Sequence, residues 1–134
     1  MELEKAKNYL KKQFYYISEA LKKKIYQFIN FLGKIVVTKI IEEKNDDSIK
    51  LYFAIDFELQ NIRLLALDSL ANEIKNNLPE NIRNYFSVQI DGDKKHIKFI
   101  FEIPNNQEEV RKNAQEVLEE LKETISKHKP LVKD

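Results

Sequence analysis

The hydrophobic pattern of the sequence changes from strand-like to helix-like at two places along the chain. Apolar and polar residues alternate over 49–57, and apolar residues then recur at three- and four-residue steps over 59–78. The first pattern is typical of a half-buried strand and the second of an amphipathic helix. Alternation returns over 86–103, and helical spacing follows it. A chain with this order must combine strands and helices in succession.

The two patterns predict two ββα units. The run 35–41 is apolar on both faces, as an inner strand would be, and 42–48 is interpreted as a charged loop. The hairpin over 86–103 turns at Asp91-Gly92-Asp93. A shift of 48 positions, from Ile49 to Ile97, lays the first strand–helix pattern on the second. Duplication of one unit and chance alignment of similar patterns both explain this match.

An apolar stripe at helical spacing precedes both units. Its members are Leu3, Ala6, Leu10, Phe14, Ile17, Leu21, Ile25, Phe28 and Leu32. Gly33 occupies the place of a helix-ending glycine, and Ser18 is a good N-cap at which the helix can break and restart. We therefore expect a helical segment over 1–33.

The predicted fold class is α+β. It has a long N-terminal helix and then two ββα units, which form a four-stranded antiparallel sheet with helices mainly on one face. The length of 134 residues suits one domain. Within a single domain over 1–134, we expect the helical segment 1–33, the first ββα unit over 34–79 and the second over 80–130.

The sequence lacks the residues on which several kinds of catalytic, metal and phosphate site depend. The chain has no cysteine and two glycines, which excludes thiolate nucleophiles, Cys-based zinc sites and glycine-rich phosphate loops. The two histidines, His96 and His128, have no ligand at metal-binding spacing on the same element. The carboxylates in 42–47 are interpreted as a solvated loop. We predict no catalytic residue, no metal, no cofactor and no small-molecule substrate, and therefore a protein that is not an enzyme.

Charge and hydropathy indicate where the protein is located and which large partners it can bind. The N-terminus is polar and acidic, unlike a signal peptide, and no run approaches the roughly 18 apolar residues that would span a bilayer. A cytoplasmic protein without a membrane partner is expected. The formal net charge of +1 argues against coating DNA by bulk charge, because phosphate neutralisation dominates such binding.

Aromatic residues off the main apolar arc distinguish the N-terminal segment. Tyr9, Tyr16, Tyr26 and Phe31 lie outside the arc when residues are placed at helical steps. Tyrosine is a favoured contact residue at protein interfaces. These four residues are the predicted partner-binding set, for another protein or for a second copy in a homodimer. The alternative is that the helix wedges between the sheet and the last helix of its own chain.

A second hypothesis concerns nucleic acid. Lys5, Lys12 and Lys23 recur on the outer side of the same segment with Tyr16 among them. Basic residues interleaved with an aromatic can grip phosphates and stack a base. The predicted function is therefore a non-enzymatic protein-binding, adaptor or chaperone-like module, and nucleic-acid binding through this stripe is the alternative.

The order of elements resembles two known families. The strand 49–57 running into Leu64-Leu65-Ala66-Leu67, the hairpin around Asp91-Gly92-Asp93 and the closing helix resemble the type III secretion chaperone-like fold, including its YbjN-type domains. That resemblance implies a dimer that holds client polypeptides without catalysis. Residues 49 to about 128, with Val110-Arg111 opening the last helix, are similar to the Pcc1 subunit of the KEOPS complex. Both likenesses imply a non-enzymatic, dimer-forming α+β protein.

Overall fold

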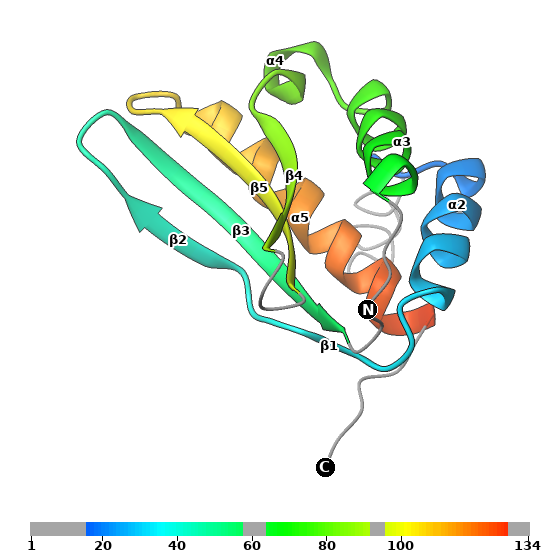
Figure 1. Ribbon diagram of the computed structural model, residues 1–134. Coiled ribbons are helices and arrows are strands. Elements are labelled where there is room, and N and C mark those ends of the chain that lie inside the picture. Colours follow the sequence, from blue (N-terminus) through cyan, green and yellow to red (C-terminus); the bar gives the residue numbers. More distant parts are fainter. Residues whose placement is uncertain (1–15, 58–63, 92–95, 129–134) are drawn as a thin grey trace, which may run out of the picture.

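The computed structural model describes residues 16–57, 64–91 and 96–128. Within them the chain is mixed α+β, with four helices and five strands (Figure 1). The helices are α2 (Glu19–Asn30), α3 (Leu64–Asn76), α4 (Glu80–Arg83) and α5 (Glu108–His128). The strands are β1 (Ile35–Val37), β2 (Ile41–Lys44), β3 (Ser48–Phe57), β4 (Phe86–Asp91) and β5 (His96–Pro104).

The strands form one open antiparallel sheet. Its order is β1-β3-β5-β4, and β2 also pairs with β3. β1 and β2 together therefore form one edge, and β4 forms the other. Figure 1 shows α5 crossing one face of the sheet, with α2 and α3 beside it. The expected antiparallel sheet is confirmed, with five strands in place of four.

The predicted alternation of β3 is confirmed by its burial. Leu51, Phe53 and Ile55 are fully buried beneath the helices. Tyr52 and Asp56 are only partly covered, since they lie on the opposite face of the sheet. β5 pairs along its whole length with β3, which places Phe53 opposite Phe99 at the centre of the core. Their rings stack with centroids 5.1 Å apart.

The prediction of one inner strand over 35–41 is wrong. Val37 pairs with Ile55 and Ile41 with Tyr52, so this chain advances four residues while β3 advances three. The extra residue is a β-bulge, which splits the run into β1 and β2. Thr38 begins it: its N–H donates to the carbonyl of Ala54 (2.9 Å), and its own hydroxyl accepts the N–H of Ala54 (2.8 Å).

The loop predicted over 42–48 is also corrected, because 42–44 belong to β2. All four residues of β2 are exposed, as at a sheet edge. Arg111 of α5 fastens this strand to the helical layer: its Nε donates to Glu42 Oε1 at 2.9 Å. The charged sequence that suggested a loop is thus the signature of a solvated edge strand.

The start of α2 agrees with the N-cap expected at Ser18. Ser18 is the N-cap of α2, and its hydroxyl oxygen accepts the N–H of Leu21 at 3.1 Å. The helix ends at Asn30 with Phe31 as its C-cap, and Gly33 follows with φ of 75°. Such a backbone angle favours glycine. The earlier part of the predicted stripe lies outside the described residues.

The second unit follows its prediction, and the link to it contains an unpredicted helix. α3 ends at Asn76, and Pro79 then precedes the short helix α4, which Ile82 anchors in the core. β4, β5 and α5 come in the expected order. The 48-residue shift places the start of β3 at Ser48 on the start of β5 at His96. Leu70 and Leu118 correspond and are both buried. Each unit contributes one inner strand and one edge of the sheet.

Candidate functional site

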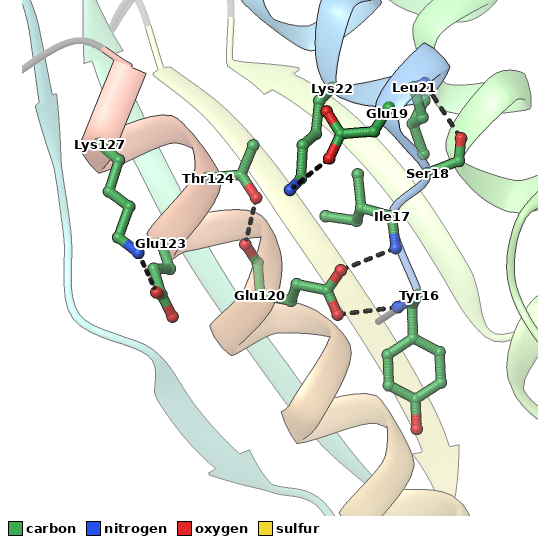
Figure 2. Close-up of polar contacts among 10 residues, drawn as sticks. All are labelled: Tyr16, Ile17, Ser18, Glu19, Leu21, Lys22, Glu120, Glu123, Thr124 and Lys127. Carbon is green, nitrogen blue, oxygen red and sulfur yellow. Dashed lines mark hydrogen bonds and ion pairs between the residues drawn. The ribbon is translucent and has the colours of Figure 1, made fainter. Parts of the chain in front are cut away.

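The first aromatic of the predicted contact set is held by the chain itself. Tyr16 precedes α2 and lies against α5, where its hydroxyl donates to Glu116 Oε1 at 3.0 Å. Its backbone N–H donates to Glu120 Oε1 at 2.8 Å (Figure 2). Burial, together with the neighbouring Glu116 carboxylate, raises the pKa of Tyr16 to about 12. Tyr16 therefore contacts the last helix of its own chain, as in the alternative interpretation of the N-terminal helix.

Glu120 joins the start of α2 to α5. Its second oxygen accepts the N–H of Ile17 at 2.7 Å, so one carboxylate receives two consecutive backbone donors. Burial raises the pKa of Glu120, although the two N–H groups oppose that shift. Ser18 caps the helix immediately afterwards. Figure 2 shows the N–H groups of Tyr16 and Ile17 both pointing at the Glu120 carboxylate of α5. The arrangement fixes the path of the chain into α2.

Tyr26 also faces α5. Its ring stacks on His128 with centroids 4.0 Å apart and planes 12° apart. Nε2 of that histidine lies 3.1 Å from Asn30 Oδ1. Tyr26 also lines a small cavity of about 80 Å³ with charged residues of both helices, including Lys22 and Glu123. Tyr26 is therefore half-buried between α2 and α5.

Phe31 alone of the described contact set stands free of the protein, with 74% of its surface exposed. Two further hydrophobic residues follow it along the chain: Val36 of β1 is 46% exposed and Ile41 of β2 is 39% exposed. No other large hydrophobic side chain that the structure describes is exposed. We call Phe31, Val36 and Ile41 the apolar strip.

Val36 and Ile41 lie on the edge strands of the sheet, and Phe31 precedes them at the C-terminus of α2. Val36 pairs with Asp56 and Ile41 with Tyr52, so both side chains lie on the sheet face away from α5. Sequence reasoning found Phe31 and missed Val36 and Ile41, because it placed their run inside the sheet. The charged residues directly after Ile41 were the available signal of an edge.

The nucleic-acid stripe is only partly described. Lys5, Lys12 and Tyr9 lie outside the described residues. Lys23 is exposed on α2, whereas Tyr16 lies between two α5 carboxylates, which would repel a phosphate. Nucleic-acid binding stays a prediction that no contact of the described residues favours.

Residues considered for chemistry have structural partners. Asp56 and His96 face each other across β3 and β5, with Oδ1 and Nδ1 in contact. Glu42 binds Arg111, and Glu43 accepts the hydroxyl of Tyr52 at 2.9 Å. Among the described residues no three His, Cys, Asp or Glu side chains form a group that could hold a metal ion. The apolar strip is therefore the candidate site.

Comparison with known proteins adds no assignment: no family model, no curated protein and no solved structure matches this chain. The likenesses to secretion chaperones and to Pcc1 stay predictions. None of the helices over the described residues is both long and apolar enough to cross a bilayer.

Proposed function

We propose that the chain is a non-enzymatic protein-binding module of the adaptor or chaperone-like kind, with the apolar strip as its contact surface. One observation carries this proposal. The exposed large hydrophobic side chains of the described residues, Phe31, Val36 and Ile41, all come from the stretch 31–41, which runs from the end of α2 into the β1 and β2 edge of the sheet. Exposed apolar residues are unremarkable singly, but a grouped set marks interaction surfaces.

The surroundings of the strip support the same function. Lys34 and Lys39 are exposed between its members, and β2 continues with exposed charged residues. An apolar centre with a polar, solvated rim is the usual anatomy of a protein interface. Phe31 is an aromatic anchor of the kind enriched at such surfaces.

Site-specific photocross-linking tests the proposal. A benzophenone amino acid replaces Phe31 in the full chain, which is expressed in cells of the source organism and irradiated. We expect a discrete protein adduct whose cross-link maps by mass spectrometry to position 31. The probe at Glu109, an exposed residue of α5, is the matched control.

The two positions together decide the outcome. An adduct at position 31 that the control lacks supports a contact surface at the strip. Equal labelling at both positions, or none at position 31, would sink the proposal, because the strip would then be ordinary solvated surface.

A further inference from the structure

Three carboxylates beside the apolar strip each have a partner within the molecule. They are Glu42, which accepts a hydrogen bond from Arg111, Glu43, which accepts the hydroxyl of Tyr52, and Asp56, which contacts His96 across the sheet. Glu42 and Glu43 follow Ile41 in β2, and Asp56 pairs with Val36. The negative charges next to the strip are therefore engaged inside the protein.

The two lysines within the same stretch differ from these carboxylates. Lys34 and Lys39 are exposed, and over the described residues neither ammonium group has an ion pair, a hydrogen bond or a ring contact. Each lies two residues before an apolar member of the strip, Lys34 before Val36 and Lys39 before Ile41. The strip thus presents aliphatic side chains together with unneutralised positive charge.

The register of the sheet sets the distance between the two aliphatic side chains. Val36 pairs with Asp56 and Ile41 with Tyr52, which are four residues apart in β3. At about 3.3 Å per residue of strand, Val36 and Ile41 lie about 13 Å apart along the sheet. In an extended polypeptide every second side chain points the same way, so residues i and i+4 cover this span with residue i+2 between them.

We propose that the apolar strip binds an extended, acidic segment of another protein. In this segment two apolar residues four positions apart contact Val36 and Ile41, and acidic residues between and beside them lie near Lys39 and Lys34. This inference rests on the proposed function, because it names the kind of partner that the same surface takes.

Side chains make this contact, without main-chain pairing at the sheet edge. Ile35 and Val37, on either side of Val36, are 1% and 7% exposed, so a partner strand has no access to their backbone. Complementary charge selects the partner, because a segment with cations would be repelled by Lys34 and Lys39. Exposed ion pairs are individually weak, so the apolar contacts and the charges must act together.

The aliphatic residues favour a polypeptide over a nucleic acid. Phosphates would also be attracted to Lys34 and Lys39, but proteins bind single-stranded nucleic acid by stacking its bases on aromatic rings. Val36 and Ile41 offer no ring. Phe31 is the aromatic member of the strip, and it lies at the C-terminus of α2 rather than between the two lysines.

Fluorescence anisotropy with the purified full chain and three labelled peptides of equal length tests the proposal. The acidic probe carries two leucines separated by Asp-Glu-Asp and flanked by glutamates. The basic probe has lysine at every acidic position, and the serine probe has serine in place of both leucines. We expect the acidic probe to bind, with an affinity that falls as salt is added, and the other two to bind at least about tenfold more weakly.

Charge reversal of the strip should invert this preference. In the double variant Lys34→Glu, Lys39→Glu the acidic probe should bind about tenfold more weakly, and the basic probe more tightly, than in the wild type. The matched control is Lys23→Glu, Lys112→Glu, which reverses two exposed lysines of α2 and α5 and changes the net charge equally. Its affinity for the acidic probe should stay within about twofold of the wild type. Circular dichroism checks that both double variants are folded.

The outcome depends on the sign of the charge and on the leucines. Equal binding of the acidic and basic probes, or an acidic probe that binds the Lys34→Glu, Lys39→Glu variant as tightly as the wild type, would overturn the inference. Displacement of the acidic probe by an equal concentration of single-stranded oligonucleotide would do the same, since the lysines would then serve nucleic acid. An acidic probe that does not bind the wild type also contradicts it.

The two proposals can fail separately. If the photoprobe at Phe31 captures a protein but the acidic probe is not preferred, the strip is a contact surface for a partner of other chemistry. If the photoprobe captures nothing and no peptide binds, both proposals fall.

Discussion

The aromatic residues at the two ends of α2 differ in their contacts and in their exposure. At the start, Tyr16 is bonded to two carboxylates of α5, and Ile17 beside it is 3% exposed. At the end, Phe31 is 74% exposed and leads into an edge strand with exposed apolar side chains. Both aromatics lie off the main apolar arc of the helical pattern, yet only the first has a neighbour to cover it.

An aromatic residue outside the main apolar arc of a helix indicates that the helix makes a second contact. Where another element of the same chain is near, that element makes the contact. α5 passes the start of α2 and holds Tyr16 and, through His128, Tyr26. Phe31, by contrast, stays exposed. Substitutions at the held start of α2 should therefore lower stability more than a substitution at its free end.

Removing the carboxylate that holds the start should have the largest effect. Glu120→Ala leaves the N–H groups of Tyr16 and Ile17 without their acceptor. Unpaired, partly buried donors cost about 1–3 kcal/mol, so the free energy of unfolding measured in urea should fall by that amount. Glu119→Ala, an exposed neighbour on α5, is the matched control and should change it by less than about 0.5 kcal/mol. Equal losses in both variants would contradict a held start.

The helix cap should contribute somewhat less. Ser18→Ala removes the acceptor of the Leu21 N–H, and loss of an N-cap costs about 1 kcal/mol. Thermal unfolding followed by circular dichroism should show a lower midpoint for this variant. Ser18→Asp retains a capping oxygen and should stay close to the wild type. The same midpoint in the wild type, Ser18→Ala and Ser18→Asp would show that the cap does not contribute to stability.

The contact of Tyr16 should appear as a pH dependence. Its folded pKa is raised from 10.0 to about 12, so the unfolded chain loses this proton first as the pH rises. The stability that the protonated phenol contributes is complete below pH 10.0 and is lost as the pH rises to about 12. Phenolate absorbance should lose one late-titrating tyrosine in Tyr16→Phe, while Tyr52, whose pKa is raised by its hydrogen bond to Glu43, still titrates late. If Tyr16→Phe loses a tyrosine that titrates at the ordinary pH instead, the contact is contradicted.

The free end should show the smallest change in stability. Phe31→Ser removes a side chain that is 74% exposed, so the free energy of unfolding should change by less than about 0.5 kcal/mol. Urea unfolding of the wild type and of the variant measures the difference. A large loss of stability would show that Phe31 belongs to the core, and the comparison between the two ends would then fail.

Much of the fold was accessible from local pattern. The alternation of Leu51, Phe53 and Ile55 predicted a strand with one buried face, because successive side chains of a strand point to opposite sides. Ser18 predicted the start of α2 through the chemistry of its hydroxyl. Such signals lie within a few residues of one another, so the sequence carries them directly.

The candidate site was accessible only in part. Phe31 was found from helical spacing, but Val36 and Ile41 were assigned to the inside of the sheet. The bulge at Thr38 depends on hydrogen bonds to Ala54, and no residue type in 35–41 announces it. Tyr16 and Tyr26 were indistinguishable from Phe31 in sequence, because their covering residues are about a hundred positions away.

The sequence by itself determined the order of the longer strands and helices, the antiparallel sheet and the inward faces of β3, β5 and α5. These follow from periodicity and capping, which act over one or two turns of chain. The tertiary structure decided which strands lie at the edges, which aromatics are covered and where apolar surface remains. Those outcomes depend on contacts between α2, α5 and the sheet, whose partners are distant in sequence. A hydrophobic pattern indicates that a face of a helix or strand will be buried. Only the folded chain shows whether residues of the same chain bury it.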